Sequence, residues 1–240
     1  FKERLVMSFD YFRNTTKDQL MTIPLPASTG SEDIVVNFGE NQNVGYDFSV
    51  AGQVIRNKNW AWTSVINGSH VKDRIKQISD KLKNTAYQLE EDNPLKLRFR
   101  EGGSQYDIYA VRSAGIDPAT GQEIFINKNG EYTFKYDAED EVVVGNTQPK
   151  LQGTWLNTLR YKGWSLNFVF SYTFGGDTYN KTLWEKVEDI DPRYNVDERA
   201  FTDRWKNPGD LSRYLAIKER RSTTPHNSVR FVERLNELWL

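Results

Sequence analysis

The clearest pattern along the chain is an alternation of apolar and polar residues with a period of two. Successive side chains of a β-strand point to opposite faces of a sheet, so the pattern predicts strands with one apolar and one polar face. Five segments show the pattern. Their apolar positions are Phe1, Leu5, Met7, Phe9 and Tyr11; Val44, Tyr46, Phe48, Val50 and Val54; Trp60, Trp62 and Ile66; Leu151, Trp155, Leu159 and Tyr161; and Trp164, Leu166, Phe168, Phe170, Tyr172 and Phe174.

The length of these segments favours strands that cross a membrane. Each runs for about ten residues, close to the ~9–11 that a tilted strand needs to span a bilayer. Strands of soluble sheets are more often ~5–6 residues long. The expected membrane strands lie near 1–12, 44–56, 60–70, 151–161, 164–174 and 229–240.

The connections between the segments alternate between short and long. Tight turns are expected at Asn57-Lys58-Asn59 and at Lys162-Gly163, where the glycine can take a positive φ. The other connections, 13–43, 71–150 and 175–228, are long, so all short turns fall at one end of the strands. Outer-membrane barrels have this asymmetry. The expected fold is therefore all-β: a fragment of a large antiparallel transmembrane β-barrel with long structured extracellular loops.

The long connections carry patterns of their own. Residues 71–92 have apolar positions close to helical spacing and predict an amphipathic helix. Segments 104–112 and 123–136 predict short strands, with a turn at 127–130. Aromatic residues are expected to form two belts, one beside the short turns and one toward the other strand ends. Their members are Trp60, Tyr161 and Trp164 in the first belt, and Tyr11, Tyr46, Tyr172 and Phe174 in the second.

Composition narrows the classes of function. The formal charge of −1 gives no reason to propose a nucleic-acid partner, which needs a basic domain or stripe. The absence of cysteine removes disulfides, thiolate metal sites and cysteine nucleophiles together. No apolar run approaches the ~18 residues of a membrane-spanning helix. Because both ends fall inside expected strands, we expect the chain to be a piece of a longer protein.

Several segments then resemble one known family. The run Gly145-Asn-Thr-Gln-Pro-Lys150, with Gly153, Asn157, Tyr161-Lys-Gly-Trp164 and Gly175-Gly-Asp-Thr-Tyr-Asn180, resembles the pattern of SusC/RagA-family TonB-linked outer-membrane proteins. Further segments fit the same family in the same order along the chain. They are Asp10-Tyr11, Asn14–Leu20, Leu25–Gly30, Asn43–Asp47, Ala114–Gly121, Arg204–Gly209 and Arg230–Glu233. The chain departs from the family pattern at Glu233-Arg-Leu-Asn236, where an acidic-glycine turn is common.

The resemblance implies a fold and a function for the whole molecule. It implies a closed barrel with a plug domain and a TonB box, neither of which is in this chain. It also implies an importer of oligosaccharides or peptides in the bacterial cell outer membrane, energised through TonB and closed by a SusD-like surface lipoprotein. In that setting Trp155, Leu166, Phe168 and Phe170 would face outer-membrane lipid, while Arg160, Asn167 and Ser171 would face the lumen.

Enzymatic chemistry is not expected from this sequence. The acidic runs at 137–141 and 188–191 could supply a carboxylate pair or calcium ligands, but they fall in predicted surface loops, where charged runs are usually solvated. We therefore expect no catalytic residue, no cofactor and no metal. Loop aromatics are the candidates for contact with a sugar or peptide substrate, against the simpler reading that they pack the loops together. They are Tyr106, Tyr109, Tyr132, Tyr136 and Trp184.

Three alternatives to an active importer stay open at this stage. A soluble β-sandwich would bury the aromatic rows in a dry core. A surface glycan-binding or adhesion module would share that fold and would fold alone in water. A passive porin would share the barrel but lack an upstream plug.

Overall fold

The computed structural model describes residues 4–24, 30, 33–80, 99–191, 193–217 and 227–240. The chain divides into two compact units. The first contains residues 1–106, 147–176 and 234–240, and the second contains residues 107–146 and 177–233. Both units are built on antiparallel sheets, which confirms the all-β expectation. In the described residues no helix is long and apolar enough to cross a membrane.

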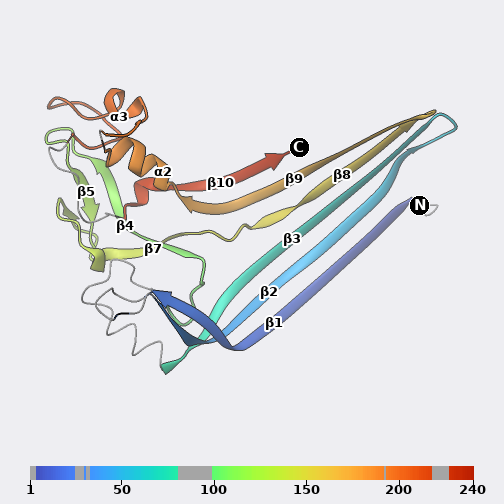
Figure 1. The fold of residues 1–240 in the computed structure, drawn as a ribbon, viewed down its shortest axis with the longest axis horizontal. Coiled ribbons are helices and arrows are strands. Elements are labelled where there is room, and N and C mark those ends of the chain that lie inside the picture. Colours follow the sequence, from blue (N-terminus) through green and yellow to red (C-terminus); the bar gives the residue numbers. More distant parts are fainter. Residues whose placement is uncertain (1–3, 25–29, 31–32, 81–98, 192, 218–226) are drawn as a thin grey trace. The chain divides into compact units, whose positions relative to one another are not determined.

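The first unit contains most of a six-stranded sheet with the order β1-β2-β3-β8-β9-β10 (Figure 1). Its strands are β1 (Leu5–Pro24), β2 (Asp33–Arg56), β3 (Trp60–Ile78), β8 (Leu151–Tyr161), β9 (Trp164–Tyr179) and β10 (Val232–Trp239). The β2–β3 and β8–β9 hairpins lie at the same end of the sheet, which we call the hairpin end. Within the described residues the sheet is open, with β1 and β10 at its edges.

The short turn between β8 and β9 differs in one detail from its expected geometry. The left-handed backbone conformation falls on Lys162, at φ 50°, and Gly163 is not among the residues with positive φ. The expected role of Gly163 as the left-handed residue is therefore wrong. The other turn is held by the side chain of Asn57, whose Oδ1 accepts hydrogen bonds from the backbone N–H groups of Asn59 and Trp60.

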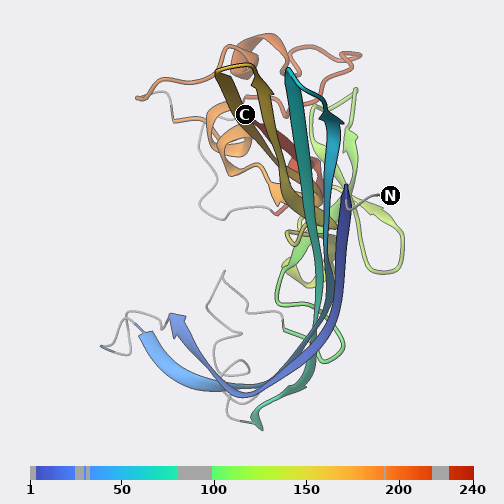
Figure 2. The ribbon, with the colours of Figure 1, turned by 90° about the vertical axis from the view of Figure 1, so that its right-hand side faces the viewer.

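The strands continue well beyond the segments that alternate most clearly. The expected loop at 13–43 is largely wrong, because residues 13–24 and 33–43 extend the β1–β2 pair, with register shifts near Thr16 and Gln19. Figure 2 shows these far ends curving away from the line of the strands. The polar residues of 13–20 hide the pairing from a search for alternation. The hydrogen-bond ladder of these residues depends on their partner strand β2 and on the irregular backbone at Asp18, which has φ 52°.

The helix expected at 71–92 is wrong in its first part. Residues 71–78 belong to β3, and residues 81–98 lie outside the described residues. Ile75 and Ile78 pack with Val36, Phe38 and Phe99 in a small buried cluster at the far end of β2 and β3. Val71, Ile75 and Ile78 are spaced by four and three residues, which is the spacing of a helix. They lie instead on a strand, and the spacing is uneven because a register shift at Glu40/Asn41 interrupts the pairing of this strand with β2.

The second unit contains a four-stranded sheet with the order β6-β5-β4-β7 and several short helical turns. Its strands are β4 (Asp107–Ile116), β5 (Glu123–Ile126), β6 (Tyr132–Thr133) and β7 (Glu141–Asn146). The helical turns are η2 (Ala138–Asp140), α2 (Lys181–Leu183), η3 (Trp184–Glu188), α3 (Arg199–Thr202) and η4 (Val229–Phe231). The turn expected at 127–130 is present, with Gly130 at φ 86°. Because η4 occupies 229–231, the last strand begins three residues later than expected.

Candidate functional site

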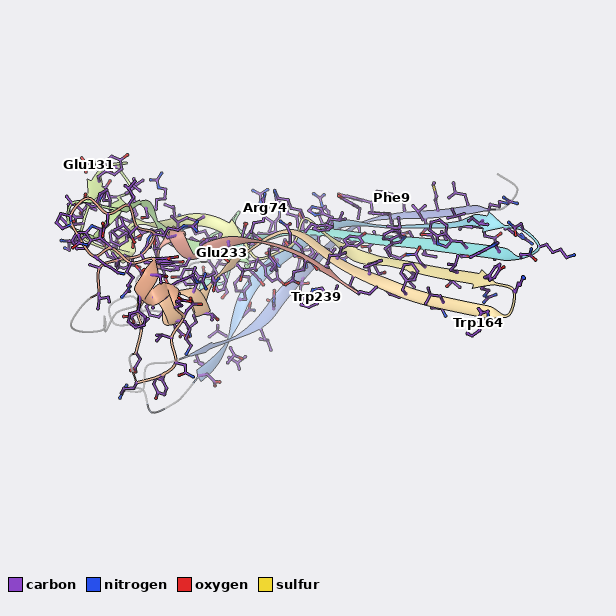
Figure 3. The ribbon with its side chains drawn as sticks, turned by 90° about the horizontal axis from the view of Figure 1, so that it is seen from above. Phe9, Arg74, Glu131, Trp164, Glu233 and Trp239 are labelled. Carbon is purple, nitrogen blue, oxygen red and sulfur yellow. The ribbon has the colours of Figure 1, made fainter. Side chains whose placement is uncertain are left out.

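The registers of the six-stranded sheet align the apolar residues into rows across the strands. One row runs Met7, Val50, Ile66, Trp155 and Phe170, and the next runs Phe9, Phe48, Gly68, Gly153 and Tyr172. The registers place all of them on one side of the sheet, which we call the apolar face. Figure 3 labels two residues of this face, Phe9 on β1 and Trp164 on β9. In the described residues no second layer covers this face. Phe9 is 68% exposed and Leu166 is 58% exposed.

The height of the apolar face matches a bilayer. A row at the hairpin end contains Trp60, Tyr161 and Trp164. A second row, ten residues further along β9 at Phe174, also contains Tyr11, Tyr46 and His70. Ten residues at ~3.4 Å each span ~34 Å along the strand. A strand tilt of ~40° reduces this to ~25 Å, the height of the apolar band of outer-membrane barrels. The two aromatic rows therefore mark the borders of a hydrocarbon-sized band.

Polar side chains inside this band are paired by tryptophans. Trp62 Nε1 donates a hydrogen bond to Asn157 Oδ1 at 3.1 Å, and Trp155 Nε1 donates to Ser64 Oγ at 2.7 Å. Asn157 is only 2% exposed beneath these rings. An unpaired polar group in hydrocarbon costs several kcal/mol, so these bonds lower the cost of placing the Asn157 oxygen and the Ser64 hydroxyl on an apolar surface, while Asn157 Nδ2 is buried without a partner.

The opposite side of the sheet, the polar face, carries the candidate functional site. A depression of about 490 Å³, which we call the outer depression, lies near the outer border of the band. Its polar-face residues are Asp47, Asn67, Ser69, Gln152, Thr154, Ser171 and Thr173. The remaining lining residues, Phe48, Gly68, Gly153 and Tyr172, form the row between them.

Hydrogen bonds connect Asn67 and Thr154 of the outer depression with Ser49, which borders it, across three strands. Ser49 Oγ donates to Asn67 Oδ1 at 2.7 Å, and Asn67 Nδ2 donates to Thr154 Oγ1 at 3.2 Å. Asp47 lies directly opposite Asp10 on β1, which concentrates negative charge at this height. Amides, hydroxyls and exposed carboxylates can hydrogen-bond a polar solute, but this set contains no nucleophile and base in contact.

A second depression of about 430 Å³ lies at the hairpin end of the same face and is basic. We call it the hairpin-end depression; it is lined by Gln53, Ile55, Arg56, Ala61, Thr63, Thr158 and Arg160. The polar face is therefore acidic toward its outer end and basic toward the hairpins. The registers also confirm that Arg160, Asn167 and Ser171 occupy the face opposite to Trp155, Leu166, Phe168 and Phe170.

The five aromatic candidates from the sequence are not brought together. Tyr106 belongs to the first unit and is exposed. In the second unit Tyr132 is 72% exposed on β6, and Tyr109 lies on β4. Tyr136 packs edge-on against Phe125 and donates a hydrogen bond to Glu141 Oε1 at 2.8 Å, while Trp184 packs against the buried cluster around Val187. Their role in substrate contact stays a prediction.

The acidic runs of the second unit are held by protein groups. Asp137 caps η2, and Asp140 Oδ1 accepts a hydrogen bond from the Lys128 backbone N–H. Asp191 is paired with the guanidinium of Arg193. Among the described residues no group of three or more side chains is arranged to hold a metal ion.

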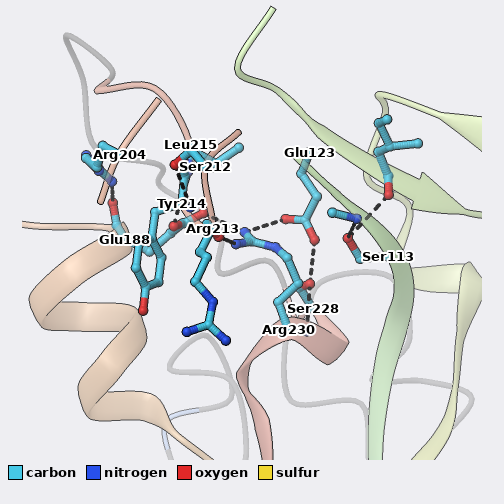
Figure 4. Close-up of polar contacts among 12 residues, drawn as sticks. Ser113, Glu123, Glu188, Arg204, Ser212, Arg213, Tyr214, Leu215, Ser228 and Arg230 are labelled. Carbon is cyan, nitrogen blue, oxygen red and sulfur yellow. Dashed lines mark hydrogen bonds and ion pairs between the residues drawn. The ribbon is translucent and has the colours of Figure 1, made fainter. Parts of the chain in front are cut away.

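A buried charge cluster forms the centre of the second unit (Figure 4). Arg230 Nη2 contacts Glu123 Oε2 at 2.9 Å and Glu188 Oε1 at 2.6 Å. Ser228 donates to Glu123, and Arg204 donates to the carbonyl of Glu188. Burial raises the pKa of the Glu188 carboxyl, and the charge of Arg230 opposes this rise. The arginine thus connects β5, η3 and η4 through charges that have little access to water.

Removing the arginine from this cluster should destabilise the second unit. We expect Arg230→Met to cost about 3–5 kcal/mol, because two buried carboxylates lose the guanidinium that pairs with both of them. The loss should shrink at acidic pH, because protonation neutralises Glu188. Burial raises the pKa of its carboxyl and the charge of Arg230 opposes this rise, so the pKa goes up further once the cation is gone. Denaturant unfolding followed by tryptophan fluorescence measures both effects. Arg193→Met is the control, because its guanidinium is exposed and water screens its pair with Asp191.

Comparison with known proteins gives the same fold and finds relatives in sequence. No protein-family model matches the chain. It is 26% identical to TonB-dependent receptor P39 of Formosa agariphila over 92% of this chain and 25% of that receptor. It is 29% identical to TonB-dependent receptor P3 of the same organism over 77% of this chain and 20% of the receptor. The chain thus spans about a quarter of the length of these relatives.

Solved structures match over almost the whole chain. The RagAB peptide transporter covers 99% of this chain with a TM-score of 0.78 at 22% identity, using 26% of its own chain. The RagAB peptide importer in its open-open state gives a TM-score of 0.74 over the same share. The fold is therefore that of a portion of a TonB-dependent receptor β-barrel. The sequence relatives are TonB-dependent receptors, so they and the fold together confirm the resemblance to the SusC/RagA family.

Proposed function

We propose that the chain forms part of the wall of an active importer in the bacterial outer membrane. The importer takes up oligosaccharides or peptides, draws energy from TonB through a plug outside this chain, and works with a SusD-like surface lipoprotein. The observation that carries the proposal is the two-faced sheet, with an apolar face of bilayer height on one side and hydrogen-bonding side chains on the other. The names of the relatives, which are receptors and a peptide transporter, support it.

In this function the apolar face contacts lipid and the polar face lines the lumen. The outer depression offers amides, hydroxyls and the carboxylate of Asp47 to a passing solute, and recognition needs no covalent step. The second unit supplies the loops on the cell surface. Its buried charge cluster keeps them folded, and its exposed aromatics, such as Tyr132, contact substrate or the lipoprotein.

The proposal is tested by expressing the complete coding sequence with its export signal. We expect a heat-modifiable band in the outer-membrane fraction and uptake of oligosaccharide or peptide that stops when TonB is deleted. Uptake that continues without TonB would identify a passive porin instead. A soluble product would support the glycan-binding or adhesion module, in which the apolar face is a sandwich core.

A further inference from the structure

A group of cations continues the apolar side of the sheet beyond the outer aromatic row. Tyr11 and His70 belong to that row, and Arg13 and Lys72 follow them two residues further along β1 and β3. Arg74 follows after two more residues of β3. Because every second residue of a strand points to the same side, all three cations share the side of the apolar face. We call Arg13, Lys72 and Arg74 the cation triad.

The cation triad has no counter-charge of its own. All three side chains are exposed. Among the residues that the structure describes, no carboxylate, Glu40 of β2 included, forms an ion pair with any of them. Asp73, which lies between the two cations of β3, is 2% exposed on the other side of the sheet. There it accepts hydrogen bonds from the Ser104 hydroxyl and from the backbone N–H of Gln105, so its charge is held away from the triad.

The triad surrounds a small surface that includes a hydroxyl group. Arg13 and Lys72 lie on either side of β2 in one row, so their backbones are ~10 Å apart. In the next row Gln42 lies between Thr15 and Arg74, and its Nε2 donates a hydrogen bond to Thr15 Oγ1 at 3.2 Å. Long cationic side chains from β1 and β3 can therefore meet at one anion between them, with the Thr15 hydroxyl beside it.

The height of the triad matches the headgroup layer of a membrane. Arg13 and Lys72 lie ~7 Å beyond the aromatic row along their strands, or ~5 Å along the membrane normal at a tilt of ~40°. The headgroup layer on each side of the hydrocarbon core is ~5–8 Å thick. Arg74 lies ~10 Å beyond the row, and its long side chain can bring the guanidinium back into this layer. The cations are therefore placed where the phosphate groups of lipids lie.

We propose that the cation triad binds a phosphate group of a lipid headgroup in the outer leaflet, while the acyl chains of that lipid lie on the apolar face. The proposal rests on the proposed function, in which the apolar face contacts lipid. It goes further by assigning a site for one lipid chemistry to β1, β2 and β3. On β9 the aromatic row is followed by Gly175 and Gly176, so the charge is local and not a ring around the sheet.

Position and charge favour a lipid over other anions. A free phosphate ion would gain little from exposed cations, because water and salt screen the attraction. A lipid adds the contact of its acyl chains with the apolar face, and arginine matches the geometry of a phosphate group. An acidic polypeptide would have to reach the triad from the side of the sheet, through the layer that lipid headgroups occupy.

Binding of purified lipid A, a phosphorylated glycolipid, tests the site in the detergent-extracted full-length receptor. The test variant combines Arg13→Gln, Lys72→Gln and Arg74→Gln, which removes the charges and keeps polar side chains. We expect a native mass spectrometry titration to show binding at least ~10-fold weaker than to the natural receptor, since each cation near a lipid surface contributes to the attraction. Removing the phosphate groups from lipid A should weaken its binding to the natural receptor by a similar factor.

Two further variants control for charge and for folding. Lys58→Gln, Lys135→Gln and Lys206→Gln together remove three exposed cations elsewhere in the chain, and this variant should bind lipid A like the natural receptor. Arg13→Lys with Arg74→Lys keeps the charges and should retain most of the binding. Heat-modifiable migration of each variant shows that it is folded. If the test variant does not fold, the comparison of lipid A with and without phosphate decides on the natural receptor alone.

The outcomes separate this inference from the proposed function. Equal binding to the test and control variants, or equal binding of lipid A with and without phosphate, would overturn the site and leave the importer intact while uptake through TonB continues. Displacement of lipid A by an excess of inorganic phosphate would identify a free anion as the occupant. A test variant that keeps lipid A but loses a co-purifying lipoprotein would identify an acidic polypeptide. A chain that never enters the outer-membrane fraction would remove both proposals.

Discussion

Phe168→Arg should prevent assembly of the receptor in the outer membrane, whereas Asn167→Arg should not. Phe168 lies near mid-height of the apolar band, opposite Asn157 and edge-on to Phe170 at 5.8 Å. An arginine at the bilayer midplane on the lipid face of a barrel costs ~2–4 kcal/mol. Asn167 is the preceding residue, so its side chain points to the polar face, where it opposes Thr158 and an arginine stays hydrated.

The measurement is the fraction of heat-modifiable receptor in the outer membrane for each variant. Because the two positions are adjacent, expression level, strand position and charge added are matched. If both variants assemble equally, the assignment of the faces to lipid and lumen is wrong. If Asn167→Arg alone fails, the faces are assigned to the wrong sides.

The sequence predicts the alternating part of the sheet because there the physical signal is local. Along β9 every second residue from Trp164 to Phe174 is apolar, and a period of two needs no knowledge of the neighbouring strands. The predicted strand at 151–161 is the β8 of the structure for the same reason. The aromatic borders are also visible, since tryptophan and tyrosine cluster where the alternation begins and ends.

The strand extensions and the candidate site depend on non-local pairing. Residues 13–19 are polar on both sides, so only their partners on β2 reveal that they form a strand. The outer depression gathers Asp47, Asn67 and Gln152 from three strands. Each is visible as a polar position in its own segment, but only the register places them in neighbouring rows. A one-residue slip would send each to the other face.

The buried charge cluster of the second unit could not be read from the sequence either. Glu188 belongs to an acidic run that resembles a solvated loop, and Arg230 and Glu123 lie far from it along the chain. Nothing in the local composition distinguishes Glu188, which is buried, from Asp191, which pairs with the exposed Arg193. The distinction arises from tertiary packing, and the structure is needed to find it.

Gly153→Ala should disrupt the central β3–β8 pair, although it adds only one methyl group. A Cβ at Gly153 would lie 2.0 Å from the backbone oxygen of Asn67 and 2.7 Å from the hydroxyl of Tyr172. The partner glycine, Gly68, is covered in the same way by the ring of Phe48. The first contact is with backbone, so it is relieved only by moving the strands apart. Overpacking of this kind costs about 1–3 kcal/mol or more, and we expect the upper end.

Two further variants separate this backbone clash from a general effect of losing a glycine. Gly52→Ala is the matched control, because its nearest neighbouring atoms are 3.9 Å from the new Cβ and the strand should accept it. Tyr172→Phe removes the hydroxyl contact, yet the double variant with Gly153→Ala should stay defective, since the contact with Asn67 persists. Assembly and urea stability of the extracted receptor are the measurements. Rescue by Tyr172→Phe would mean that the Tyr172 side chain over Gly153, rather than the close approach of the two backbones, requires the glycine.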